Sequence, residues 1–173
     1  AVNQFNVERY LHLLLRHVML DRHVEQLSFF LRGFDEVVPS CIVAVFTASE
    51  FEDVIAGLNE PIDVDDWMKH TWYLGAYKKH GADHEVVDWF WKWVRSLDVD
   101  GKARLLQFVT GSARVPVGGF SALQGDDGTL MSFTVDSIPP SMSVYPRAHT
   151  CFNRIELPVY ESEDDLRKFC SQV

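Results

Sequence analysis

Cys151 and His149 stand two positions apart near the C-terminal end of the chain, and a cysteine beside basic residues is typical of a nucleophilic site. The reactive form of cysteine is the thiolate, which a nearby cation stabilises. Arg147 and His149 are the candidate cations, and backbone amides around Thr150 are candidates to donate to the thiolate or to a developing oxyanion. The candidate catalytic residues are therefore Arg147, His149, Thr150 and Cys151.

Two prolines determine the backbone that we expect around the thiol. Pro146 disfavours a helical conformation in the residue before it, and Pro158 has no amide hydrogen to give to a sheet. We therefore expect Cys151 to lie in an exposed loop that leads into a short strand. Burial as an inert structural residue is the alternative for any single cysteine, and we interpret Cys41 and Cys170 in that way.

Histidines and cysteines elsewhere give no sign of a metal site. The other six histidines show no ligand spacing with cysteine or carboxylates, so we predict no metal and no cofactor. For His149, a role in orienting the loop by hydrogen bonding is the alternative to that of a general base. Three cysteines without close spacing fit neither a disulfide framework nor a zinc site, which indicates a reducing compartment, the cytoplasm or the nucleus.

The composition limits the classes of function. Hydrophobic residues make up 47% of the chain, which contains 12 Phe, 5 Trp and 5 Tyr, so a folded core is expected. The formal net charge of -9, without a basic run, argues against binding to nucleic acid or to an anionic membrane. No apolar run approaches the length of a membrane span, and no secretory signal is recognisable.

The N-terminal half is predicted to be helical because its apolar residues recur at intervals of three and four. Asn6 is a candidate cap for the first helix, and Pro39 follows the second. The expected helices cover residues 6–20, 24–37, 47–57 and 63–73.

The composition changes at residues 75–83, where Gly75 and Gly81 flank a charged stretch without apolar periodicity. We predict a linker here. Beyond it we expect two helices, then short segments of period two, then a last helix that Ser162 caps. The expected strands are residues 114–117, 130–135 and 155–157. The fold class is therefore α+β, with a helical N-terminal segment and a C-terminal part that contains a short-stranded sheet.

Four segments in this order and spacing resemble the catalytic domain of HECT-type ubiquitin ligases. They are Trp89-Phe90-Trp91, the run from Leu105 to Phe120, His149-Thr150-Cys151-Phe152-Asn153, and the run from Leu157 to Ser162. Upstream segments around Phe30, Glu50 and Trp67 are also similar to the family, so that the resemblance covers nearly the whole chain.

The resemblance implies two lobes and a transfer reaction. Residues 1–74 would be the helical part of the N-lobe, residues 75–83 a hinge that moves at Gly75 and Gly81, and residues 84–173 the C-lobe. Cys151 would accept ubiquitin from a conjugating enzyme as a thioester and pass it to a lysine of a protein substrate. The first helix resembles part of the family's binding site for the conjugating enzyme, which assigns that contact to Tyr10 and Leu14.

The sequence departs from the family pattern in three ways. The family's catalytic domain is longer than this chain, its C-terminal tail with a functional aromatic residue has no counterpart here, and Tyr145 stands where the family usually has leucine. The alternative function is therefore a non-catalytic fragment that binds ubiquitin or a conjugating enzyme without transfer. A Cys-His hydrolase is a third hypothesis, but no Asn or Asp is recognisable as the residue that would orient the histidine.

Overall fold

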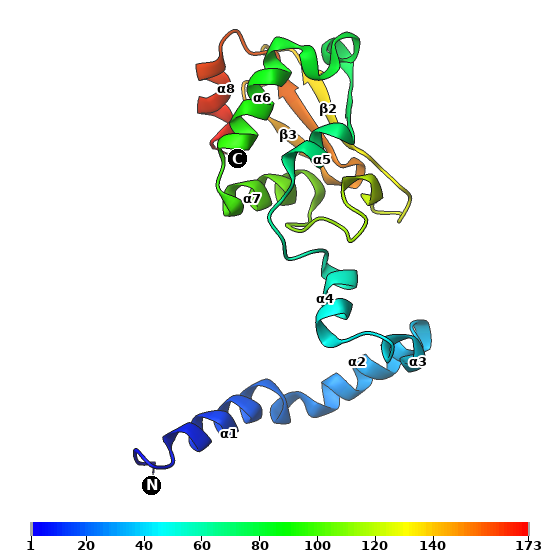
Figure 1. Cartoon of the computed structure of the whole chain (residues 1–173), viewed down its shortest axis with the longest axis vertical. Coiled ribbons are helices and arrows are strands. Elements are labelled where there is room, and N and C mark those ends of the chain that lie inside the picture. Colours follow the sequence, from blue (N-terminus) through cyan, green and yellow to red (C-terminus); the bar gives the residue numbers. More distant parts are fainter. Residues whose placement is uncertain (1, 173) are drawn as a thin grey trace. The chain divides into compact units, whose positions relative to one another are not determined.

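The computed structural model describes residues 2–172 and contains two compact units, which divide between Ala48 and Ser49. Figure 1 shows helices alone in the first unit and helices with a sheet in the second. This mixture of helices and a four-stranded sheet confirms the predicted α+β class. Within residues 2–172, no helix has both the length and the apolar character that a membrane crossing requires.

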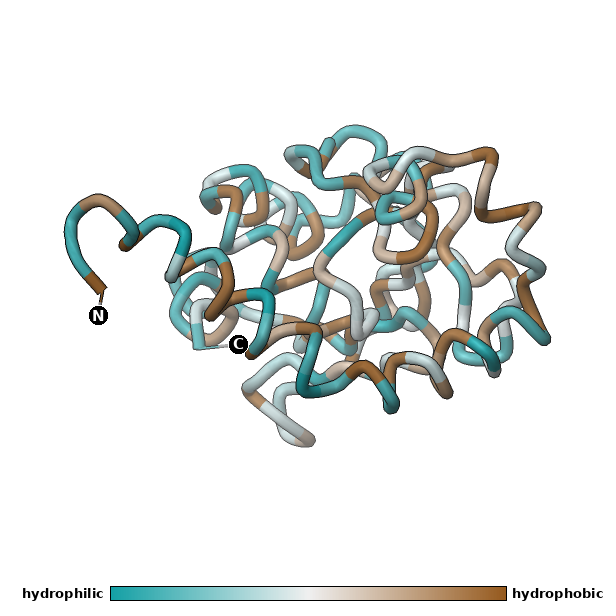
Figure 2. Tube along the Cα trace, turned by 90° about the horizontal axis from the view of Figure 1, so that it is seen from below, coloured by the Kyte–Doolittle hydropathy of each residue, from teal (hydrophilic) through white to brown (hydrophobic). Residues whose placement is uncertain are grey.

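The first unit contains two long helices, as its apolar periodicity predicts. They are α1 (Val7–Met19) and α2 (Val24–Val37), joined by a short 3-10 turn and followed by α3 (Ser40–Val43). Asn6 precedes α1 but does not cap it, because its side-chain oxygen accepts from the Asn3 amide at 2.8 Å. Figure 2 shows hydrophobic and hydrophilic positions alternating along the trace near the N-terminal end. No residue of α1 or α2, both of which the structure describes in full, is buried.

The second unit holds the core. Its principal helices pack around the sheet: α6 contacts α8, and α7 contacts β3 and β4 (Figure 1). The helices are α4 (Ala48–Ala56), α5 (Val64–Lys69), α6 (Glu85–Ser96), α7 (Val99–Thr110) and α8 (Glu163–Cys170), and the strands are β1 (Thr71–Tyr73), β2 (Phe133–Ile138), β3 (Arg147–His149) and β4 (Arg154–Pro158). Five short 3-10 turns, one of them in the first unit, complete the described elements.

The sheet has the order β1-β2-β4-β3, in which β1, β2 and β4 are parallel and β3 is antiparallel to β4. Strands β2 and β4 overlap the strands predicted at 130–135 and 155–157. The strand predicted at 114–117 is wrong, because in that segment only Val115 forms a bridge, to Leu58. The helix predicted over 63–73 ends at Lys69, and β1 follows because its residues pair with Phe133 to Val135.

Two local signals explain how the helices of this unit begin and end. Asp63 caps α5 by accepting from the amides of Asp65 and Asp66, and Asp98 caps α7 by accepting from the Gly101 amide at 2.7 Å. Helix α7 stops at Gly111, whose φ of 82° is the left-handed conformation that glycine adopts readily. These ends fix α7, which supports the edge of the sheet near Cys151.

The predicted hinge, residues 75–83, lies within the second compact unit and is anchored there by one buried side chain. Tyr77 is completely buried, and its hydroxyl donates to the carbonyls of Leu157 at 2.9 Å and Pro158 at 3.0 Å. The amide of Ala76 donates to the Ser137 hydroxyl at 2.6 Å. The segment forms two 3-10 turns, Gly75–Lys79 and Gly81–Asp83, and the compact units divide after residue 48. The hinge role of Gly75 and Gly81 stays a prediction. Glycines and charged residues in this segment are typical of a linker. The residues around Tyr77 show no apolar periodicity from which the burial of Tyr77 could be predicted.

Alanine substitutions at the two glycines distinguish a packed segment from a free linker. Both have positive φ, so Gly81→Ala costs about 1–2 kcal/mol of unfolding free energy through backbone strain alone. A Cβ on Gly75 would also lie 2.2 Å from the Ser137 oxygen, which adds about 1–3 kcal/mol from overpacking. Denaturant unfolding followed by tryptophan fluorescence measures both, since all five tryptophans lie between residues 67 and 93. Equal losses for the two variants would contradict the packing of this segment.

Candidate active site

Cys151 lies in the tight connection between β3 and β4. His149 pairs with Arg154 across the two strands, so residues 150–153 form the turn between them. Residues Thr150–Phe152 make a 3-10 turn, and Cys151 is exposed on it. This is the exposed loop before a short strand that the prolines predict, although residues 147–149 form a strand themselves. A thiol in this position is open to another molecule.

Asn153 closes the turn from the inside. It is almost fully buried and has a φ of 46°, in the left-handed region that asparagine tolerates better than most residues. Its backbone amide donates to the Thr150 carbonyl at 3.2 Å. Its side-chain NH2 donates to the carbonyls of Gln124 at 2.9 Å and Met131 at 2.8 Å. Sequence analysis assigned no role to Asn153, although an asparagine directly after a predicted loop and before a strand was the available signal.

The imidazole of His149 lies against a carboxylate of the neighbouring strand. Its Nε2 is 3.0 Å from Oε1 of Glu156, which is within ion-pair distance, but the two groups lack hydrogen-bond alignment. The contact is therefore electrostatic and is attractive when the imidazole is protonated. Glu156 is a residue that sequence analysis missed, because its proximity to His149 depends on the pairing of β3 with β4.

The other predicted site residues lie on the same hairpin with different partners. Arg147 is exposed and donates to the Met142 carbonyl at 3.3 Å. Thr150 is exposed, directly before Cys151. A second cation, Arg154, places its guanidinium 5.7 Å from the centre of the Phe152 ring and 3.8 Å from the Asp136 carboxylate. The hairpin therefore brings positive side chains to both strands that lead into the turn.

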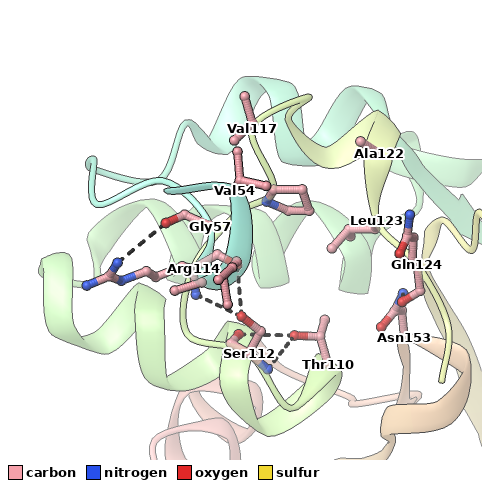
Figure 3. Close-up of a pocket in the computed structure, with 13 residues that line it drawn as sticks. Val54, Gly57, Thr110, Ser112, Arg114, Val117, Ala122, Leu123, Gln124 and Asn153 are labelled. Atoms are coloured by element: carbon pink, nitrogen blue, oxygen red, sulfur yellow. Dashed lines mark hydrogen bonds between the residues drawn. The ribbon is translucent and has the colours of Figure 1, made fainter. Parts of the chain in front are cut away.

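A pocket adjoins the buried side of this turn (Figure 3). It has a volume of about 400 Å³ and is lined by aliphatic residues of α4 and of the loops that follow α7, together with the amides of Gln124 and Asn153. Arg114 on the opposite wall pairs with Glu52 at 2.9 Å and reaches the Gly57 carbonyl at 3.5 Å. Asn153 thus belongs both to the pocket wall and to the turn that carries Cys151. Among the described residues, no group of three or more His, Cys, Asp or Glu is suited to hold a metal ion.

The three cysteines differ in accessibility. Cys170 is buried, and this burial raises the pKa of its thiol to about 12, against a smaller opposing effect of its hydrogen bond with Tyr160. Cys151 and Cys41 are exposed, which corrects the interpretation of Cys41 as structural.

Alkylation will follow this difference in exposure. At pH 8, iodoacetamide is expected to label Cys151 and Cys41 while Cys170 stays unmodified, because a buried thiol with a pKa of about 12 remains protonated. Peptide mass spectrometry after a short exposure measures the labelled fraction at each cysteine. Labelling of Cys170 at the rate of Cys151 in the folded chain would contradict the burial of Cys170, and unfolding in urea provides the fully labelled reference.

The predicted contact residues for a conjugating enzyme, Tyr10 and Leu14, lie one turn apart on α1 in the first unit. Tyr10 is 46% exposed and Leu14 is 41% exposed, so both apolar side chains are accessible in this chain.

Comparison with known proteins gives consistent matches. The family described as HECT-domain (ubiquitin-transferase) matches residues 1–171. The chain is 41% identical over 166 residues to the human E3 ubiquitin-protein ligase NEDD4, which covers 96% of this chain and 12% of that protein. It is 41% identical over 167 residues to the E3 ubiquitin-protein ligase RSP5 of Saccharomyces cerevisiae, covering 96% of this chain and 20% of that protein. It is also 43% identical over 165 residues to the probable E3 ubiquitin-protein ligase hulA of Aspergillus fumigatus, covering 95% and 19%. The chain therefore spans a fifth or less of the length of these relatives.

Proposed function

The chain belongs to the HECT-domain family of ubiquitin transferases, which confirms the resemblance, and from this premise we propose that Cys151 carries ubiquitin as a thioester between a conjugating enzyme and a protein substrate. The observation that supports the proposal most directly is the exposed thiol at the tip of the β3–β4 hairpin. A buried thiol has no access to the terminus of another protein, whereas this one does.

The proposed reaction consists of two acyl transfers. The Cys151 thiolate attacks the thioester carbonyl that joins ubiquitin to the conjugating enzyme, a new carbon–sulfur bond forms, and the enzyme's thiolate leaves. A substrate lysine amine then attacks the new thioester. An amide bond forms, the Cys151 thiolate leaves, and the amine gives up a proton to solvent or to a base. No oxidant, metal or cofactor enters either step.

We assign supporting roles to the other hairpin residues. A free thiol with a pKa of about 8.5 is only a few per cent ionised near neutrality, so the thiolate benefits from nearby positive charge. His149 and Arg147 on β3 supply that charge in the proposal, and the Glu156 carboxylate 3.0 Å from His149 holds the imidazole in place. Thr150 contributes through the backbone of the turn, where amides are suited to stabilise the oxyanion of each tetrahedral intermediate.

The proposed partners are ubiquitin, a ubiquitin-conjugating enzyme and protein substrates. Tyr10 and Leu14 would contact the conjugating enzyme, since α1 exposes both apolar side chains. The net charge of -9 favours partners with basic surfaces over nucleic acid. Three free cysteines, two of them exposed, fit a reducing compartment such as the cytoplasm or nucleus.

A loading assay tests the proposal. The full chain is incubated with activating enzyme, ATP, ubiquitin and a panel of conjugating enzymes, and the products are separated without reducing agent. The expected product is the chain plus one ubiquitin, and dithiothreitol should remove the ubiquitin. If no conjugating enzyme in the panel gives this adduct while ubiquitin or a conjugating enzyme still binds the chain in solution, the alternative of a non-catalytic binding fragment replaces the proposal.

A further inference from the structure

We propose that Asn153 is a positioning residue for the acyl transfer proposed above, because it fastens the turn of Cys151 to the loop Gln124–Met131. This inference rests on the proposed function and concerns a residue that does not touch the reacting atoms. We call residues 124–131 the support loop.

The backbone of Asn153 fixes where the turn ends. With φ at 46° and ψ at 39°, it reverses the chain so that its amide closes on the Thr150 carbonyl at 3.2 Å. Its own carbonyl accepts from the Thr134 amide at 2.9 Å, which ties the turn to strand β2. Cys151 therefore lies in a closed turn whose last residue is anchored in the sheet.

The side chain of Asn153 joins both ends of the support loop. An amide NH2 group has two hydrogens, and here they reach the carbonyls of Gln124 at 2.9 Å and Met131 at 2.8 Å. Since the side chain is almost completely buried, water cannot replace these hydrogen bonds without rearrangement. The donor capacity of the NH2 group is thus fully used in holding the loop against the turn.

The support loop has internal hydrogen bonds that make it a defined platform. The Gly125 amide donates to the Thr129 carbonyl at 2.9 Å, and the Gly128 amide donates to the Gly125 carbonyl at 3.1 Å. The Asp127 carboxylate accepts from the amide and the hydroxyl of Thr129 at 2.9 Å and 2.7 Å, and these hydrogen bonds lower the pKa of Asp127. Because these hydrogen bonds close the loop, we expect its middle to move together with its two ends.

Gly125 brings the loop against the backbone of the cysteine itself. A Cβ built on Gly125 would lie 3.1 Å from the Cys151 carbonyl oxygen, a separation closer than ordinary van der Waals contact. The loop therefore touches Cys151 at its carbonyl and is fastened two residues further on by Asn153. A shift of the loop will move the cysteine backbone and change the direction of the thiol.

Two substitutions disturb this arrangement in different ways. Asn153→Asp keeps the size and the left-handed backbone but presents carboxylate oxygens to two carbonyls, which removes both hydrogen bonds and adds repulsion. Gly125→Ala adds a single methyl against the Cys151 carbonyl at a position without positive φ, so that backbone strain does not confuse the result. The matched controls are Asn59→Asp at an exposed position and Gly33→Ala, whose Cβ would meet nothing within 4 Å.

The experiment measures loading and thiol reactivity on the full chain. Single-turnover transfer from a ubiquitin-loaded conjugating enzyme gives a maximal rate and a half-saturating concentration. Iodoacetamide alkylation of Cys151 gives a pH–rate profile for the thiol. Thermal melting shows whether each variant is folded. Because a displaced nucleophile loses rate at saturation, we expect the maximal rate to fall at least about tenfold in Asn153→Asp and about threefold in Gly125→Ala. The half-saturating concentration and both control variants should stay at wild-type values, while the alkylation profile shifts in the two test variants.

The outcomes separate this inference from the function on which it rests. A wild-type chain that fails to load, together with a shifted alkylation profile in Asn153→Asp or Gly125→Ala, would overturn the proposed transfer and support the positioning of the thiol. Wild-type maximal rates and wild-type alkylation profiles in the folded Gly125→Ala variant would overturn the positioning role. A lower melting temperature in Asn153→Asp with an unchanged pH–rate profile would also overturn it, because that result describes a structural residue only.

Discussion

Replacing Cys151 by serine will abolish the ubiquitin adduct that dithiothreitol removes. Serine keeps the size of the side chain but replaces the thiol by a hydroxyl, which is a much weaker nucleophile at neutral pH. We expect the loading rate to fall on the order of a thousandfold or more, in line with the removal of other catalytic nucleophiles. The measurement is the loading assay on a non-reducing gel, followed by brief exposure to base. Any adduct that remains should resist dithiothreitol and be removed by base, because it would be an ester.

The other two cysteines provide the controls for this prediction. Cys41→Ser removes an exposed thiol of the first unit and should leave the reducible adduct in place. Cys170 is buried with a pKa raised to about 12, so it is a poor acceptor in the folded chain. A reducible adduct that persists in Cys151→Ser and disappears in the double variant with Cys41→Ser would assign the acceptor to Cys41.

Local sequence signals predicted the position of the thiol and the long helices. Pro146 and Pro158 limit the backbone on both sides of Cys151, so an exposed loop before a strand could be expected from short-range sterics alone. Helices α1 and α2 match the predicted 6–20 and 24–37 within a residue at each end, because their apolar spacing is regular. Both features depend on residues close in sequence.

Features that depend on distant pairings could not be predicted in this way. Strand β1 has three residues and exists because Thr71 pairs with Phe133, sixty-two positions later in the chain. Strand β3 likewise forms through its pairing with β4, where it brings Glu156 to His149. A three-residue strand has too few positions to show a period of two, so its sequence resembles a loop or a helix end.

In segment 75–83, too, the local sequence could not predict a contact with a distant part of the chain. Glycines with positive φ occur both in flexible linkers and in tightly packed turns, so their presence alone does not indicate motion. Here the buried Tyr77 hydroxyl reaches two carbonyls at the end of β4, about eighty residues along the chain. The structure therefore gives Gly75 a steric role beside Ser137, and the hinge role of this segment stays a prediction.

Trp67→Ala is expected to have the largest effect on stability of any single substitution considered for this chain. Trp67 is completely buried, and its ring stacks on Phe120 at 4.9 Å and meets Phe133 and Trp91 edge-on at 5.1 Å and 5.8 Å. Its removal leaves a cavity between α5, α6 and β2, and large-to-small substitutions of buried aromatic residues cost about 3–5 kcal/mol. Urea unfolding, followed by circular dichroism to avoid the loss of the fluorophore, gives the change in unfolding free energy.

Trp72→Ala is the matched control, because the tryptophan side chain five residues later is 67% exposed on β1. Its removal should change the unfolding free energy by no more than about 0.5 kcal/mol. A third variant, Trp67→Phe, separates packing from polarity. The Trp67 indole Nε1 is buried without a hydrogen-bond partner among the described residues, so phenylalanine removes an unsatisfied donor while it keeps an aromatic ring in the stack. We therefore expect Trp67→Phe to recover more than half of the stability that Trp67→Ala loses. Equal losses at positions 67 and 72 would contradict the assignment of Trp67 to the centre of the core that supports β2 and, through it, the turn of Cys151.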